Sequence, residues 1–155
     1  MPVKILFVCL GNICRSPLAE AIFIHKIKEL SLESDFIAQS CGTANYHIGD
    51  PPDPRTIRNA FKNGIPINHL GRQLSTTDLD SFDFILAMDQ SNLNNIKRLH
   101  NSKENCDKIS LMRSYDPLGR DQDAPDPYYG SENDFQEVFT ILNRSIDSLI
   151  ESFRK

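Results

Sequence analysis

Residues 3–30 combine a strand and a helix on either side of a short turn. Residues 3–8 are apolar except for one lysine, a pattern typical of a strand that is buried in a sheet. In residues 17–30 the apolar side chains recur at helical spacing, and we expect Ser16 to cap this helix and Pro17 to occupy its first position. The predicted apolar face consists of Ala19, Ile22, Phe23, Ile27 and Leu30. A strand that runs directly into a helix is the building unit of α/β proteins, so it strongly restricts the possible folds.

The rest of the chain continues this alternation. Residues 36–40, 82–89 and 108–112 are further strand candidates, and each is bounded by turn-forming or helical sequence. Strands that alternate with helices predict an α/β three-layer sandwich, in which a mainly parallel sheet is flanked by helices. Residues 113–130 carry many turn formers and charges, so they predict a long loop, and a loop of that length in a compact domain is often functional.

Three more helices are expected between and after these strands. One begins at Asp53-Pro54 and ends at Gly64, the next is capped by Asp89, and the last is opened by Ser131. Their predicted apolar faces are Ile57, Ala60 and Phe61 in the first; Leu93, Ile96 and Leu99 in the second; and Phe135, Val138, Phe139, Leu142, Ile146, Leu149, Ile150 and Phe153 in the last.

Length and composition limit the class of protein. A chain of 155 residues predicts one domain, residues 1–155, and a net charge of −4 does not favour a nucleic-acid partner. The first apolar run is too short for a signal peptide and no segment reaches membrane-spanning length, so we expect a cytoplasmic protein without a membrane partner. In that compartment the four cysteines, Cys9, Cys14, Cys41 and Cys106, should be mostly free thiols.

Residues 9–16 carry the strongest chemical signal. They join a strand to a helix N-terminus, where backbone N–H groups and the helix dipole favour an oxyanion. Gly11 and Asn12 accept a left-handed or crowded backbone, and Arg15 offers a planar fork that matches two phosphate oxygens. In such a field Cys9 is expected to be a thiolate, to which Ser16 Oγ could donate a hydrogen bond. The stretch therefore predicts a nucleophile beneath a bound phosphate.

Other interpretations of this stretch have less support. A nucleotide-binding P-loop needs a lysine after its glycines, and none is present. Cys9 and Cys14 could be half of a zinc site, but two further ligands would be needed and Cys41 is isolated, so we expect no metal. Cys9 as an ordinary core thiol remains an alternative.

Cleavage of a phosphate ester also needs a proton for the leaving oxygen. The sequence "APDPYYG", residues 124–130, offers Asp126 between two prolines that would stiffen the loop around a general acid. Tyr128 and Tyr129 could form an apolar wall that excludes water and stacks on an aromatic substrate. The alternative is an ordinary Pro-Asp turn with packed tyrosines.

Taken together, "VCLGNICRSPLAEAIF" near the N-terminus and "DPYYG" near the C-terminus resemble the low-molecular-weight protein tyrosine phosphatase family. The resemblance covers essentially the whole chain. It implies a four-stranded parallel sheet with a phosphate-binding loop after the first strand, and no cofactor. It further implies that Cys9 forms a phosphocysteine, that Arg15 clamps the phosphate, that Ser16 stabilises the thiolate and that Asp126 is the general acid.

The resemblance also implies supporting roles. Asn12 shapes the loop, with Ser40 and His69 as its hydrogen-bonding partners, and Cys14 can form a reversible disulfide with Cys9. The remaining implied phosphate-loop residues are Leu10, Gly11, Ile13 and Cys14, and the implied substrate cleft is formed by Ile13, Tyr46, Tyr128 and Tyr129. Asp89 matches a family aspartate, but helix capping explains it without chemistry.

The predicted function is hydrolysis of phosphotyrosine and aryl phosphate monoesters, with acid phosphatase activity and inorganic phosphate as product. Arsenate reductases resemble this family, but residues 83–100 contain no cysteine and Cys106 stands alone. Arginine phosphatases that resemble it carry Thr where Ile13 stands. A cysteine phosphocarrier would need neither Arg15 nor Asp126. A monomer is the simpler expectation for a small α/β domain.

Overall fold

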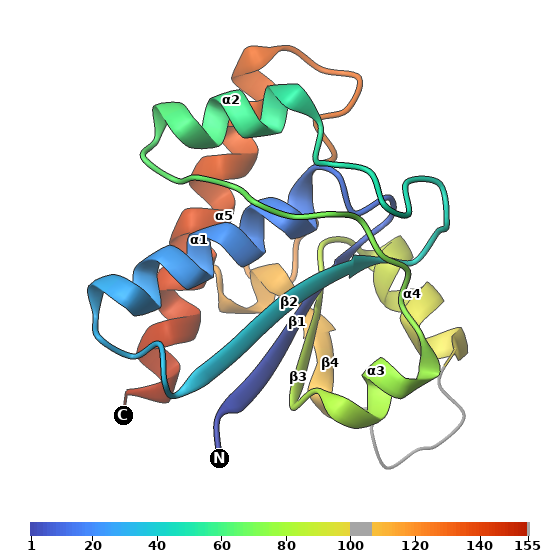
Figure 1. Cartoon of the computed structure of the whole chain (residues 1–155), viewed down its shortest axis with the longest axis vertical. Helices are drawn as coiled ribbons and strands as arrows, with labels where there is room; N and C mark the ends of the chain where they lie inside the picture. The colour runs from blue at the N-terminus through green and yellow to red at the C-terminus, as the bar shows by residue number, and fades with distance from the viewer. Residues whose placement is uncertain (100–106, 155) are drawn as a thin grey trace.

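Strand β1 lies in the middle of a four-stranded sheet (Figure 1). The protein was analysed as a computed structural model that describes residues 1–99 and 107–154. The sheet order is β2-β1-β3-β4, and every neighbouring pair is parallel, which confirms the predicted fold class. The strands are β1 (Val3–Cys9), β2 (Phe36–Gly42), β3 (Phe84–Ala87) and β4 (Ile109–Leu111).

Helices cover both faces of this sheet (Figure 1). One layer contains α1 (Arg15–Glu29), α2 (Pro54–Lys62) and α5 (Glu132–Phe153). The other contains α3 (Thr76–Ser81) and α4 (Gln90–Leu99), and a short 3-10 helix, η2 (Met112–Tyr115), follows β4. No helix in residues 1–99 or 107–154 is long and apolar enough to cross a membrane.

The side chains of β1 alternate between two apolar cores. Ile5 and Phe7 pack with residues of α1 and α5, whereas Leu6 and Val8 pack with residues of α3 and α4. All four are 0% exposed. Because both faces of a central parallel strand are buried, the sequence shows an unbroken apolar run instead of an alternating one.

Helix α1 begins earlier than its sequence pattern predicts. It starts at Arg15, so Ser16 lies inside the first turn and no side chain caps the helix. The Ser16 hydroxyl is instead bonded within the turn that precedes the helix. The predicted apolar face holds for its other members, but Leu30 lies beyond the helix and is 42% exposed.

Helices α2 and α3 differ most from expectation. On α2 the predicted apolar Phe61 is 76% exposed, and the buried side consists of Thr56, Asn59 and Ala60. Helix α2 packs against α5 through this buried side. Because none of its three residues is large and apolar, the apolar pattern of the sequence does not predict it. Helix α3 was not predicted at all, because its six residues include one apolar side chain, Leu79.

Three predicted helix caps are present. Asp53 Oδ1 accepts a hydrogen bond from Arg55 N at 2.9 Å, and Asp89 Oδ1 accepts one from Asn92 N at 2.7 Å. Ser131 forms a capping box at the start of α5. Strand β3 (Phe84–Ala87) is shorter than the predicted range 82–89, because Asp89 lies beyond the strand and caps α4. Because all four strands are parallel, their carboxyl ends lie at the same edge of the sheet.

Candidate active site

The turn between β1 and α1 directs its carbonyl oxygens outward. Three of them accept hydrogen bonds from N–H groups of neighbouring segments, at 2.9 Å for Cys9 O, 3.0 Å for Leu10 O and 2.8 Å for Ile13 O. The C=O of a trans peptide and the N–H that follows it point in opposite directions, so the next N–H groups face the centre of the turn. These inward N–H groups belong to Leu10, Gly11 and Cys14, and they form a cradle of the kind that is typical of anion-binding sites.

A glycine outside the turn allows this geometry. Gly42 ends β2 beside the turn, and a Cβ atom built on it would lie 2.7 Å from Leu10 O. No side chain fits at that distance, so the turn can fold against β2 only if residue 42 is glycine. Sequence reasoning missed Gly42, because its role depends on a contact between distant segments.

The sulfur of Cys9 lies at the base of the cradle. Cys9 is 3% exposed, its Sγ is 3.0 Å from Ser16 Oγ, and it accepts a hydrogen bond from Asn12 N at 3.3 Å. Asn12 N and Ser16 Oγ therefore both contact the sulfur, which lies close to the N-terminus of α1.

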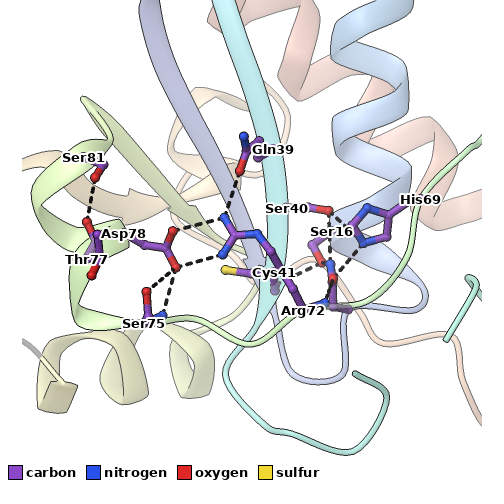
Figure 2. Close-up of polar contacts among 11 residues, drawn as sticks. Ser16, Gln39, Ser40, Cys41, His69, Arg72, Ser75, Thr77, Asp78 and Ser81 are labelled. Atoms are coloured by element: carbon purple, nitrogen blue, oxygen red, sulfur yellow. Dashed lines mark hydrogen bonds and ion pairs between the residues drawn. The ribbon is translucent and has the colours of Figure 1, made fainter. Parts of the chain in front are cut away.

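Asn12 organises the turn through its side chain. Its φ of 58° is left-handed, a conformation that asparagine tolerates better than most residues. The Nδ2 group donates to Ser16 Oγ at 2.7 Å and to Ser40 Oγ at 3.1 Å. The Oδ1 atom accepts from Arg72 N at 3.1 Å and lies 2.7 Å from His69 Nε2. Figure 2 shows Ser16, Ser40 and His69 converging from α1, β2 and the segment before α3. The structure thus brings together all the residues predicted to support Asn12.

A buried carboxyl group extends this network. Glu20 Oε1 accepts a hydrogen bond from Ser40 Oγ at 2.6 Å and lies 3.5 Å from His69 Nδ1. Burial raises the pKa of Glu20, although the Ser40 hydrogen bond opposes the shift. Burial, together with the positive charge of Arg72, lowers the pKa of His69, so the imidazole is neutral at neutral pH and can donate its Nε2 proton to Asn12.

Arg15 closes the other side of the site. It is 3% exposed, and its Nη1 donates to Asp89 Oδ2 at 2.8 Å and to Ala124 O at 2.9 Å. Its Nη2 lies 3.8 Å from Asp126 Oδ2. Burial opposes the charged form of Arg15, but the negative charges of Cys9, Asp89 and Asp126 raise its pKa overall. Asp89 therefore has two roles, the predicted helix cap and an ion pair that sequence reasoning missed.

The loop that carries Asp126 is held by local contacts. Asp126 Oδ1 accepts a hydrogen bond from Tyr128 N at 3.1 Å, while its side chain stays 45% exposed. The rings of Tyr128 and Tyr129 pack edge to face, with their centroids 5.0 Å apart. The guanidinium carbon of Arg55 lies 5.4 Å from the centroid of the Tyr128 ring. The carboxylate thus has a set direction and is open to solvent.

A cavity of about 270 Å³ connects these groups. The residues that line it are Cys9, Leu10, Gly11, Ile13, Cys14, Arg15, Tyr46, His47, Asp126, Tyr128 and Tyr129. All the predicted cleft residues are among them. The remaining predicted residues do not line the cavity and form the supporting network behind it: Asn12, Ser16, Ser40 and His69. His47 was not predicted, and nothing in its sequence context distinguishes it. Its Nδ1 lies 3.2 Å from Asp50 Oδ2.

Cys14 and Cys41 are poor nucleophiles in their buried positions. Cys9, Cys14 and Cys41 are free thiols, as predicted, and Cys106 lies outside the described residues. Burial raises the pKa of Cys14 to about 12, and burial raises that of Cys41 even further. Within the described part of the chain, no group of three or more His, Cys, Asp or Glu side chains could hold a metal ion.

Comparison with known proteins agrees with this geometry. The family model described as low molecular weight phosphotyrosine protein phosphatase matches residues 4–155. A Schizosaccharomyces pombe protein of that name is 46% identical over 141 residues, 90% of this chain and 90% of that protein. The Homo sapiens protein of that name is 41% identical over 149 residues, 96% of this chain and 94% of its own. The crystal structure of protein tyrosine phosphatase from Entamoeba histolytica, with Hepes in the active site, has a TM-score of 0.94 at 35% identity and covers 98% of this chain and 97% of its own. The chain therefore belongs to the low molecular weight phosphotyrosine protein phosphatase family and is an enzyme of that kind.

Proposed function

We propose that this enzyme hydrolyses phosphotyrosine and aryl phosphate monoesters through a phosphocysteine on Cys9. The observation that carries the proposal is the position of the Cys9 sulfur, beneath inward N–H groups and beside the buried Arg15. A phosphate held by those N–H groups and by the guanidinium would have its phosphorus next to the sulfur. Asp126, close to Arg15, would face the ester oxygen on the opposite side.

In the first step the Cys9 thiolate attacks phosphorus, and a sulfur–phosphorus bond forms as the bond to the aryl oxygen breaks. The aryl oxygen takes a proton from the Asp126 carboxyl group, so a neutral phenol leaves. The N–H groups and Arg15 stabilise the charge that spreads over the three remaining phosphate oxygens.

In the second step the Asp126 carboxylate accepts a proton from water as the water oxygen attacks phosphorus. The sulfur–phosphorus bond breaks, inorganic phosphate is released and the sulfur regains its negative charge. Ser16 Oγ and Asn12 N are the donors that stabilise this charge. Asp126 is protonated again at the end, so the cycle is complete without any group other than those of the chain, substrate and water.

The shape of the cavity supports an aromatic substrate. Ile13, Tyr46, Tyr128 and Tyr129 all line it, so the wall contains three aromatic rings and an aliphatic side chain against which a planar ring can pack. A serine phosphate has no ring to make these contacts.

The other expectations from the sequence stay proposals. We propose that residues 1–155 form one phosphatase domain and that the enzyme is a cytoplasmic monomer with acid phosphatase activity. Its partners would be phosphotyrosine proteins, with no role for nucleic acid, a membrane, a metal or another cofactor.

Release of inorganic phosphate from matched phosphotyrosine and phosphoserine peptides tests the proposal. We expect rapid release from the first, little from the second, and no reduction of arsenate in the presence of thioredoxin. Cys9→Ser should abolish turnover. Substantial turnover by Cys9→Ser would exclude covalent catalysis, and equal rates on the two peptides would exclude the proposed specificity.

A further inference from the structure

A segment that is remote from Cys9 in sequence lies against the phosphate-binding turn. Residues 69–74 run beside the end of β2, where Gly42 N donates to Arg72 O at 2.9 Å and Leu74 N donates to Gly42 O at 2.7 Å. The same segment presents Arg72 N and His69 Nε2 to Asn12 Oδ1. Both contacts to Oδ1 therefore depend on where this segment lies.

The side chain of Arg72 anchors the segment. Its Nη1 and Nη2 donate to the two carboxylate oxygens of Asp78 at 2.9 and 3.1 Å, and Nη2 also donates to Gln39 Oε1 at 3.1 Å. Figure 2 shows this guanidinium between Asp78 of α3 and Gln39 of β2, away from His69. A bidentate pair of this kind restricts orientation as well as distance.

Asp78 is itself held in place. Its Oδ2 atom accepts hydrogen bonds from Ser75 N at 2.9 Å and from Ser75 Oγ at 3.2 Å, which closes the start of α3. The Asp78 side chain is 10% exposed. The carboxylate is thus a fixed point between helix α3 and the segment that carries Arg72.

We propose that the Arg72–Asp78 ion pair is a positioning device for the phosphate-binding turn. By fixing residues 69–74, the pair holds Arg72 N and His69 against Asn12 and so keeps Asn12 in its left-handed conformation. Asn12 in turn directs its backbone N–H to the Cys9 sulfur and its Nδ2 group to Ser16. Arg72 is not one of the residues lining the cavity, so it is a positioning residue and not a catalytic one. The inference rests on the proposed function.

The consequence for the reaction follows from this chain of contacts. A left-handed asparagine persists only when its surroundings hold it there. If residues 69–74 shift, Asn12 Oδ1 loses both of its partners, and the donors around Cys9 lose their alignment. A displacement of about 1 Å can lower a rate about a hundredfold, so partial loss of alignment is expected to cost about tenfold.

The test compares Arg72→Gln with Ser75→Ala. Arg72→Gln removes the bidentate pair, whereas Ser75→Ala removes only a hydroxyl from the same Asp78 carboxylate and leaves Arg72 bonded. For each variant we would measure kcat on p-nitrophenyl phosphate and the inhibition constant of inorganic phosphate, normalised to the folded fraction from circular dichroism.

We expect Arg72→Gln to lower kcat about tenfold and to weaken phosphate inhibition about tenfold. Ser75→Ala should leave both within twofold of the wild type, even if its melting temperature falls. A purely structural role would lower the melting temperature of Arg72→Gln but would leave kcat and the inhibition constant of the folded enzyme unchanged, and that result would overturn the proposal.

A second variant covers the case in which Arg72→Gln does not fold. Asp78→Asn keeps the size of the side chain and weakens the same pair, so it should show the same two losses, and normal values would refute the proposal. Where both variants fold, the double variant should be no worse than Arg72→Gln, because both act through one contact. If the double variant instead shows the product of the two single losses in kcat, the positioning proposal is contradicted. If Cys9→Ser stays active, the proposed function fails; if only the Arg72 result is negative, the positioning role alone fails.

Discussion

Removal of the Ser16 hydroxyl should slow the second chemical step selectively. Ser16 is 0% exposed, and Oγ accepts a hydrogen bond from Asn12 Nδ2 at 2.7 Å. Its own proton is therefore free for one of two acceptors, Cys9 Sγ at 3.0 Å or Cys41 O at 3.3 Å. The nearer acceptor is the sulfur, which carries a negative charge in the proposed mechanism. Ser16→Ala deletes one of the two hydrogen bonds that stabilise the sulfur when it leaves phosphorus.

The size of the effect follows from the type of bond lost. A hydrogen bond to a charged group contributes about 1.5–3 kcal/mol, and a change of about 1.4 kcal/mol alters a rate tenfold. We therefore expect kcat to fall by roughly one to two orders of magnitude. KM should fall in parallel with kcat, so that kcat/KM changes little, because the phosphocysteine accumulates when only the second step is slowed.

Stopped-flow turnover of p-nitrophenyl phosphate separates the two steps. The variant should release a burst of p-nitrophenol, equal to the enzyme concentration, before a slow steady state. Ser145→Ala is the matched control, since Ser145 is also 0% exposed and donates to Ile141 O within α5 at 2.8 Å. Its kcat should stay within twofold of the wild type. A Ser16→Ala enzyme with kcat within threefold of the wild type would refute the reasoning.

Three further predictions concern other groups of the site. Asp126→Ala should slow phenyl phosphate by about 10²–10⁴-fold and p-nitrophenyl phosphate much less, because a good leaving group needs no proton; equal losses would argue against the acid role. Folding lowers the pKa of His69, so between that lowered pKa and about 6.5 the folded state binds fewer protons than the unfolded state. His69 therefore contributes to the free energy of unfolding above about pH 6.5. This contribution is lost as the pH falls through the pKa of the folded state. The melting temperature should then depend less on pH between about 7 and 5 in His69→Gln than in the control His25→Gln, and identical slopes would contradict this. Since the pKa of Cys14 is raised to about 12, its disulfide with Cys9 should form faster at higher pH after peroxide treatment. When a thiol reductant is then added, Cys14→Ser should recover less activity than the wild type. Equal recovery would exclude a redox role for Cys14.

The elements that could be predicted from sequence are those with a long apolar pattern or with both faces buried. Strand β1 has a continuous apolar run and helix α5 has a long apolar pattern at helical spacing, and both are where the sequence predicts them. Helix α3 has six residues and one apolar side chain, Leu79, and the capping box of Ser75 and Asp78 is the local signal that could have revealed it. Phe61 was predicted to be buried and is exposed, because the nine-residue helix α2 packs through Thr56, Asn59 and Ala60 instead.

The same distinction applies to the site. Residues 9–16 are contiguous, so their chemistry can be inferred from one stretch of sequence. The second role of Asp89 is different, because it comes from a contact with Arg15, which lies 74 positions away. Arg72 and Gly42 escaped notice for the same reason: each acts through backbone contacts with a distant turn, and residue type alone does not indicate such contacts.

In the proposed mechanism the two carboxylates around Arg15 have separate roles, one in binding and one in chemistry. A guanidinium that is 3% exposed needs a permanent counter-charge when the cavity is empty. Asp89 supplies it at 2.8 Å, and its other oxygen is fixed by the N-terminus of α4. Asp126, at 3.8 Å and 45% exposed, is then not required to hold the guanidinium. It can give up a proton and take one back without leaving Arg15 unpaired. Exchanging these distances would trap the general acid in an ion pair, so a firmly held Asp89 is a condition for a reactive Asp126.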